Sequence, residues 1–110
     1  MRVVIKEPGR KPVEQQVPNT LESLQHIVGG YIETVTLNEN SVLLVNEEGM
    51  IMNLPYNCTF IYPSAKMPFK TFGTIVLVGY DGDEFVDAQE TLESHGPGEC
   101  RCYLTKREGK

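Results

Sequence analysis

Five polar side chains could together bind a small ligand, because each lies where a turn or the end of a strand is expected. They are Tyr31, Glu33, Asn46, Tyr56 and Asn57. At such positions polar groups can converge on a ligand over an apolar floor. Asn46 and Asn57 also suit turns in which the side chain bonds to its own backbone, an explanation that accounts well for Asn46 and poorly for Tyr56. Both a small-ligand pocket and simple turn chemistry therefore remain open at this point.

Two lysines in a predicted loop add what an anionic ligand needs. Lys66 and Lys70 lie close in sequence to Tyr62 and Phe69. An ammonium group binds phosphate, and an aromatic ring can stack on a nucleic-acid base. This is the one local combination in the chain that suits a nucleotide-like ligand, so we include Lys66 and Lys70 in the predicted ligand site.

Three side chains near the C-terminus have the chemistry of zinc ligands. His95, Cys100 and Cys102 lie within eight residues, and Cys58 or His26 could supply a fourth ligand. The Cys-x-Cys spacing is shorter than the spacing of two to four intervening residues that zinc sites usually have. A tail with reduced thiols is the better explanation, so we assign no metal and no cofactor.

Catalytic chemistry finds little support in the sequence. The serines lack a Gly-x-Ser-x-Gly elbow, and no cysteine has a base placed beside it. A hydrolase with paired carboxylates would rely on Glu47 or Glu48, with Glu33 as a further candidate. The paired glutamates lie in a predicted turn, where two solvated charges are the simpler explanation. We assign no catalytic residue and keep a small hydrolase using Glu47/Glu48 as an alternative.

The charges are segregated along the chain. Residues 12–65 carry six Glu and no Lys or Arg, and residues 71–100 carry seven acidic residues and no base. Binding of DNA or RNA polymers needs clustered Lys and Arg, so a nucleic-acid-binding face over the body of the domain is excluded. A surface of one sign instead steers association with basic partners, which makes an acidic, DNA-mimic-like inhibitor of a host protein a second hypothesis. Its face would contain Asp83, Glu84, Asp87 and Glu90.

One helix is predicted at residues 20–28. Asn19 is a residue type that favours the N-cap, and Glu22 lies where a capping-box carboxylate reaches back to it. Apolar residues recur at helical spacing through the segment. Gly29 then favours the left-handed conformation that ends helices.

Alternating and β-branched residues predict strands around this helix. The candidates are residues 2–6, 12–17, 31–37, 41–45, 58–62 and 73–80. After a turn, Phe85, Ala88 and Leu92 share one helical face and predict a second helix. That helix spans residues 84–94. The expected fold class is α+β: a mostly antiparallel sheet of five or six strands with both helices packed on one face.

The length of 110 residues indicates one domain. We expect residues 1–95 to form it and residues 96–110 to be a polar C-terminal extension. The longest apolar run, residues 74–79, is too short to span a membrane, and three cysteines fit reduced thiols better than a secreted disulfide scaffold. We therefore expect a cytoplasmic protein without membrane contact. Free sheet edges favour a homo-oligomer, most simply a homodimer.

Several motifs in the first 80 residues resemble one family. They are Glu7-Pro8-Gly9, Asn19-Thr20-Leu21-Glu22-Ser23-Leu24-Gln25, Val28-Gly29-Gly30-Tyr31-Ile32-Glu33, Asn46-Glu47-Glu48-Gly49 and Leu54-Pro55-Tyr56-Asn57. They are similar to the family called domain of unknown function 3846, which occurs in bacteria, phages and plasmids. The resemblance implies a small protein carried on mobile elements. It implies no catalytic residues.

The sequence therefore predicts a non-catalytic protein of a phage or mobile element that binds a small anionic or nucleotide-like ligand. Sequestering a nucleotide-type signal in counter-defence is the function we expect. The alternatives are the acidic inhibitor of a host factor and the hydrolase.

Overall fold

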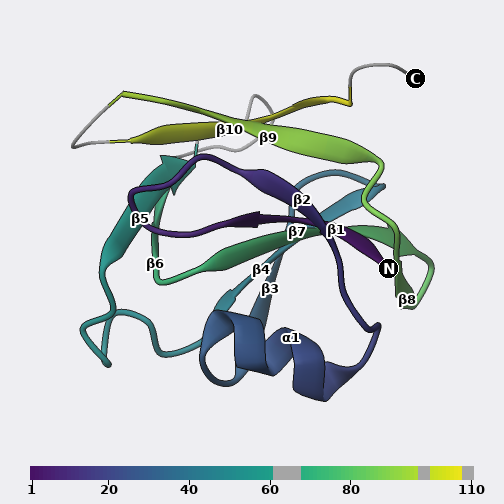
Figure 1. The fold of residues 1–110 in the computed structure, drawn as a ribbon, viewed down its shortest axis with the longest axis horizontal. Coiled ribbons are helices and arrows are strands. Elements are labelled where there is room, and N and C mark those ends of the chain that lie inside the picture. Colours follow the sequence, from purple (N-terminus) through teal and green to yellow (C-terminus); the bar gives the residue numbers. More distant parts are fainter. Residues whose placement is uncertain (61–67, 97–99, 108–110) are drawn as a thin grey trace.

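The computed structural model describes residues 1–60, 68–96 and 100–107, which form two β-sheets and one helix in three layers (Figure 1). The helix α1 spans Leu21–Val28. The strands are β1 Arg2–Lys6, β2 Val13–Gln16, β3 Ile32–Thr36, β4 Ser41–Asn46, β5 Tyr56–Phe60, β6 Phe69–Phe72, β7 Ile75–Asp81, β8 Glu84–Val86, β9 Glu90–His95 and β10 Arg101–Lys106.

The first sheet, here called sheet A, forms the middle layer. Its strand order is β2-β1-β7-β4-β3, and β8 pairs with β7. All of its pairings are antiparallel. The central strand β7 is buried from Ile75 to Gly79, as its unbroken run of apolar residues predicts.

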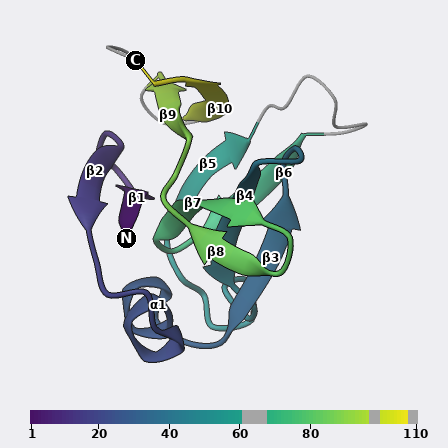
Figure 2. The ribbon, with the colours of Figure 1, turned by 90° about the vertical axis from the view of Figure 1, so that its right-hand side faces the viewer.

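The second sheet, sheet B, has the order β6-β5-β10-β9 and lies across one face of sheet A (Figure 2). The β5–β10 pairing is parallel, whereas the β5–β6 and β9–β10 pairings are antiparallel. Residues 101–106 of the expected polar extension thus supply an inner strand of this sheet. The side chain of Cys102, in that strand, is fully buried.

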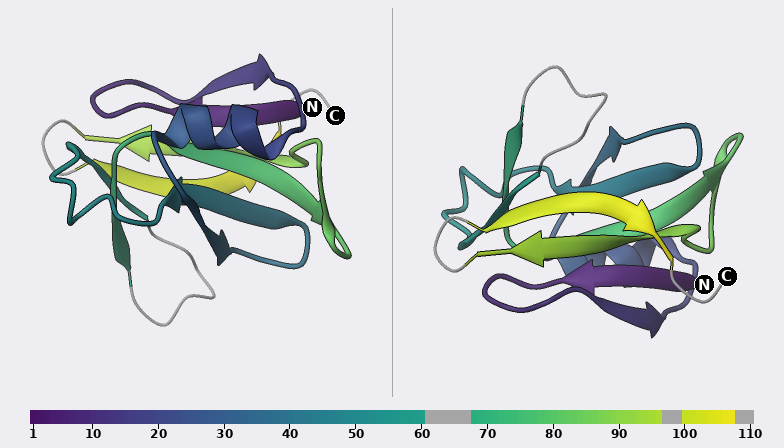
Figure 3. Two further views of the ribbon diagram at one scale, coloured as in Figure 1. Left: turned by 90° about the horizontal axis from the view of Figure 1, so that it is seen from below. Right: turned by 90° about the horizontal axis from the view of Figure 1, so that it is seen from above.

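Helix α1 covers the opposite face of sheet A (Figure 3). The helix predicted at residues 20–28 is confirmed, but the N-cap is Thr20 and not Asn19: Thr20 Oγ1 accepts a hydrogen bond from Ser23 N at 3.1 Å. Asn19 instead donates its side-chain amide to Phe85 O. Gly29 ends the helix at φ 84°, as expected. Among the described residues, no helix is long and apolar enough to cross a membrane.

The α+β class is confirmed in outline, but the predicted second helix at residues 84–94 is wrong. These residues form β8 and β9, and the face of sheet A opposite α1 is covered by sheet B instead. A turn at Gly82, with φ +70°, folds β8 back onto β7. β9 then pairs with β10 along its whole length, from Glu90↔Lys106 to His95↔Arg101. The expected single sheet of five or six strands is therefore two sheets, with ten strands in the described residues.

The close approach of two chain segments at Gly79 generates a prediction about stability. A Cβ atom at Gly79 would lie 2.2 Å from Asp87 O, so Gly79→Ala must displace the backbone that leads from β8 into β9. We expect Gly79→Ala to lower the free energy of unfolding by about 3 kcal/mol or more, measured by urea denaturation. Gly82→Ala is the control, because its Cβ would meet nothing within 4 Å and would cost only the left-handed strain of about 1 kcal/mol. Equal effects of the two substitutions would contradict the close approach.

Candidate functional site

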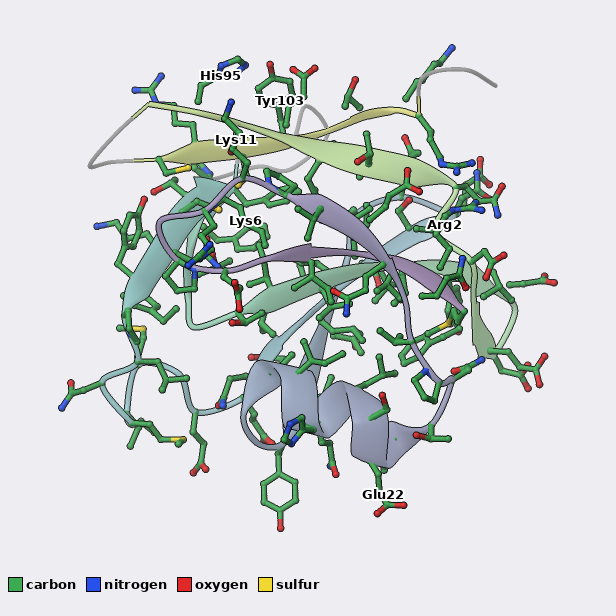
Figure 4. The ribbon with its side chains drawn as sticks, viewed as in Figure 1. Arg2, Lys6, Lys11, Glu22, His95 and Tyr103 are labelled. Carbon is green, nitrogen blue, oxygen red and sulfur yellow. The ribbon has the colours of Figure 1, made fainter. Side chains whose placement is uncertain are left out.

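The first candidate site is a cavity of about 460 Å³ between the turn of the β1–β2 hairpin and one end of sheet B. We call it the cationic pocket. It is lined by Lys6, Gly9, Arg10, Lys11, Tyr56, Asn57, Ser94, Gly96 and Cys100. Figure 4 shows Lys6 and Lys11 in this region. Of these nine described residues, three are bases and none is acidic.

Lys6 is the unusual member of this pocket, because its side chain is only 1% exposed. Its ammonium donates to Asn57 Oδ1 at 2.8 Å and to Glu7 O at 3.3 Å. The Asn57 amide donates in turn to Lys6 O and to Gly73 O, both at 2.8 Å. Asn57 thus uses its oxygen and its NH₂ group to join β1, β5 and the entry to β7.

Buried ammonium groups normally have an anionic partner, since desolvation of an unpaired charge is costly. Within residues 1–60, 68–96 and 100–107, no carboxylate forms an ion pair with Lys6. An ammonium group also has three donor hydrogens, and the two hydrogen bonds named above use two of them. The remaining capacity, at the wall of a cavity with two further bases, fits an anionic ligand.

All three cysteines of the chain gather beside this pocket and are free thiols. Cys58 and Cys102 are fully buried between the sheets. A hydrogen bond from Cys102 is the main influence that lowers the pKa of Cys58 to about 7, and the Lys6 ammonium contributes. The same hydrogen bond, together with burial, raises the pKa of Cys102. The pair therefore loses one proton near neutral pH and holds the other firmly.

The residues predicted to form one ligand site are divided between two cavities. Tyr56 and Asn57 line the cationic pocket. A second cavity of about 480 Å³ contains Glu33, Asn46 and Lys70. We call it the apolar pocket. Two predicted residues remain: the side chain of Tyr31 is 69% exposed, and Lys66 lies outside the described residues.

The apolar pocket lies where the β3–β4 edge of sheet A meets β6 of sheet B. Its lining residues are Glu33, Val35, Val45, Asn46, Glu47, Glu48, Gly49, Met50, Ile51, Phe69, Lys70, Thr71 and Phe72. Asn46 has its polar atoms occupied within the fold: its amide donates to Val28 O at 3.1 Å and its oxygen accepts from Glu48 N at 2.7 Å. Asn46 therefore ties the end of α1 to the turn after β4.

Comparison with known proteins gives one match. A model of the family described as Domain of unknown function (DUF3846) matches residues 1–95. The chain belongs to this family. Curated proteins and solved structures give no match. The lining residues of both pockets lie within the family match, apart from Gly96 and Cys100 of the cationic pocket.

Sequence reasoning did not assign Lys6, Arg10 and Lys11 to the site of this DUF3846 protein. These bases surround the predicted Glu7–Arg10 turn, so their proximity to each other could be inferred from the sequence. Their approach to Ser94 and Cys100 could not, because it depends on the pairing of β9 with β10 and of β10 with β5.

The possible zinc ligands are placed in different surroundings. Cys102 is buried, whereas His95 lies on the exposed outer side of sheet B (Figure 4). His95 Nε2 and Tyr103 OH are 2.6 Å apart, and Tyr103 OH donates to Glu93 Oε2 at 2.6 Å. This hydrogen bond raises the pKa of Tyr103. Across the described parts of the chain, no three His, Cys, Asp or Glu side chains are arranged to hold a metal ion.

The hydrogen bonds by which Asn57 joins β1, β5 and the entry to β7, here called the clamp, can be tested through stability. Asn57→Ala removes the 2.8 Å acceptor of the buried Lys6 ammonium and the donor to two backbone carbonyls, so we expect the free energy of unfolding to fall by about 3 kcal/mol or more in urea denaturation. Asn19→Ala, which removes an exposed amide–carbonyl bond, is the control and should cost less than about 1 kcal/mol. A loss for Asn57→Ala as small as that of the control would argue against the clamp.

The thiol pair generates a prediction about pH. Because the pKa of Cys58 falls from 9.0 to about 7 on folding, the native protein binds fewer protons than the unfolded chain between these values. The contribution of Cys58 to stability should therefore grow as the pH rises from 7 to 9, and it should be lost as the pH falls through 7. Above pH 9 the raised pKa of Cys102 reverses the trend.

Ultraviolet thiolate absorbance and urea denaturation across this pH range provide the measurements. Cys58→Ser should remove the absorbance step near pH 7, Lys6→Met should move it to higher pH, and Cys100→Ser should preserve it. A step that survives in Cys58→Ser would show that another group is responsible.

Proposed function

We propose that this protein is a non-catalytic binder of a small anionic, nucleotide-like ligand, which it holds in the cationic pocket. The observation that carries the proposal is the Lys6 ammonium, buried at the wall of the cavity without a carboxylate partner in the described residues. An anionic ligand would place a negative charge at this wall of the cavity.

The other residues of the pocket suit such a ligand. Arg10 and Lys11 contribute further positive charge to the lining, and the 3.5 Å ion pair of Arg10 with Glu7 is exposed and therefore weak. Tyr56 adds an aromatic ring, and Ser94 a hydroxyl group. A volume of about 460 Å³ lies in the range of small-molecule sites. These features support phosphate recognition with room for an attached organic group.

The anion-binding site that we propose is not the one predicted from the sequence, which contained the loop with Lys66 and Lys70. In the apolar pocket, Lys70 shares the lining with Glu33, Glu47 and Glu48. These carboxylates would repel a phosphate group. Among its described lining residues the cationic pocket has no acid, so the charge of these residues favours a phosphate group there.

The alternatives have less support. The acidic inhibitor was expected to present Asp83, Glu84, Asp87 and Glu90 on one face. Asp87 Oδ1 accepts from Arg2 N, and Glu90 Oε1 accepts from Ser41 Oγ at 2.6 Å, so two of its four carboxylates serve the fold. For the hydrolase, Glu47 and Glu48 are both exposed in a turn.

The biological setting extends the proposal. Sequestering a nucleotide-type signal in the cytoplasm, on behalf of a phage or other mobile element, fits a non-catalytic pocket of this size. A homo-oligomer stays a prediction, with β2 and β3 as the outer strands of sheet A.

Isothermal titration calorimetry with cyclic and linear nucleotides, and with inorganic phosphate, tests the proposal. We expect binding of at least one nucleotide at micromolar protein. Lys11→Glu should weaken this binding about tenfold or more, because replacing a positive charge with a negative one at a phosphate site costs at least about 1.4 kcal/mol of binding free energy. Lys6→Met should act in the same direction while keeping the length of the side chain.

Lys70→Glu is the matched control, because it makes the same charge change at the other pocket. It should leave nucleotide affinity within about twofold of the unmodified protein. The proposal fails if no nucleotide binds, or if Lys11→Glu and Lys70→Glu weaken binding equally.

A further inference from the structure

Three consecutive apolar side chains point into solvent beside the apolar pocket. Met50, Ile51 and Met52 are 72%, 80% and 50% exposed. Single exposed apolar residues are common, but a contiguous group beside a cavity marks an interaction site. Tyr31, whose side chain is 69% exposed, lies close by, because its carbonyl accepts a hydrogen bond from Glu47 N at 2.8 Å. We call residues 50–52 the apolar turn.

The backbone of the apolar turn is held in place by hydrogen bonds. Met52 N donates to Glu48 O at 2.8 Å, and Leu54 N donates to Gly49 O at 3.0 Å. Gly49 is buried, and a Cβ atom there would lie 3.0 Å from Phe72 O. The turn is therefore fixed against β6 and presents its apolar side chains in a defined position.

The adjoining pocket combines an apolar floor with an acidic rim. Val45 is buried, and Val35, Phe69 and Phe72 are half-buried in its lining. The exposed residues of the lining, besides Met50 and Ile51, are Glu33, Glu47, Glu48 and Lys70. Among the described residues, three acids and one base give this surface a negative charge next to its apolar side chains.

From this juxtaposition we infer that the apolar pocket and the apolar turn bind a basic amphipathic segment of a partner protein. The cavity of about 480 Å³ accepts one or two apolar side chains of that segment. Lys or Arg residues one helical turn away then meet the acidic rim. Methionine side chains suit such a site, because they are flexible and polarizable and adapt to different apolar partners.

A second copy of this chain would fit the surface less well. In a two-fold dimer the same patch faces itself, so the acidic rims of the two copies would be brought together. Like charges at close range oppose association. Charge complementarity therefore favours a basic partner.

The experiment uses the full chain and two fluorescently labelled synthetic peptides. One is an amphipathic helix of Leu and Lys, and the other has Glu in place of every Lys. We expect fluorescence anisotropy to show binding of the Leu/Lys peptide only, and added salt to weaken it. The double substitutions Met50→Ser with Ile51→Ser, and Glu47→Lys with Glu48→Lys, should each weaken binding about tenfold. Lys70→Glu should strengthen it.

Two matched variants separate this site from general attraction to an acidic protein. Leu21→Ser removes an apolar side chain that is 64% exposed on α1, and Asp83→Lys with Glu84→Lys reverses two exposed charges at the β7–β8 turn. Both should bind the Leu/Lys peptide as the unmodified chain does. Circular dichroism of every variant confirms that it is folded.

Several outcomes would overturn the inference. They are an absence of binding by the Leu/Lys peptide, equal binding of both peptides, and equal weakening by the site variants and the matched variants. Sedimentation that shows a dimer lost specifically in Met50→Ser with Ile51→Ser would assign the surface to a second copy instead. None of these results bears on the cationic pocket, so this inference and the proposed function can fail separately.

Discussion

The buried contact between Lys6 and Asn57 is the constraint on which the arrangement of the two sheets depends. Lys6 ends β1 of sheet A, and Asn57 lies in β5 of sheet B. The Lys6 ammonium donates to Asn57 Oδ1, and the Asn57 amide donates to the main-chain carbonyls of Lys6 and Gly73, all at 2.8 Å. Apolar packing between sheets has little directional preference, whereas these bonds require one relative position. The pair therefore fixes how the end of sheet B lies against the hairpin.

The same contact determines what the chain can do at that end. Gly73, whose carbonyl accepts from Asn57, has φ +80° and leads from β6 of sheet B into β7 of sheet A. With this connection held, the β1–β2 turn lies opposite the end of β9, and the space left between them is the cationic pocket. This buried polar contact thus fixes the position of the end of sheet B relative to the β1–β2 hairpin, and it leaves a positive charge at a cavity wall.

The parts of the fold that depend on local chemistry could be predicted from the sequence. Helix α1 follows from its apolar spacing and from Gly29, and β7 from its continuous apolar run. Residues 84–94 were misassigned because Phe85, Ala88 and Leu92 also satisfy helical spacing. What makes β9 a strand is its pairing with β10, and β10 is itself held by β5, about 40 residues earlier in the chain. A local window contains none of these contacts.

The candidate site was predictable to a similar extent. Tyr56 and Asn57 were predicted because turns and strand ends concentrate functional side chains, and both line the cationic pocket. Asn46, chosen for the same reason, has its amide and its oxygen occupied by Val28 O and Glu48 N. The alternative explanation, in which Asn46 is a turn residue whose side chain bonds to the nearby backbone, is correct for its oxygen, which accepts from Glu48 N. The burial of Lys6 could not be foreseen, because a lysine at the end of a short strand is ordinarily solvated.

The net charge of −5 would by itself argue against an anionic ligand. Exposed charges, however, are screened over about 8–10 Å in physiological salt, so a ligand responds mainly to the groups that line its site. Lys6 is also desolvated, and charges act more strongly where water is excluded. The bases gather at the β1–β2 turn, while Glu33, Glu47 and Glu48 border the opposite pocket. The charge segregation along the sequence thus becomes a separation in space, and the charge of each pocket favours a ligand of the opposite charge.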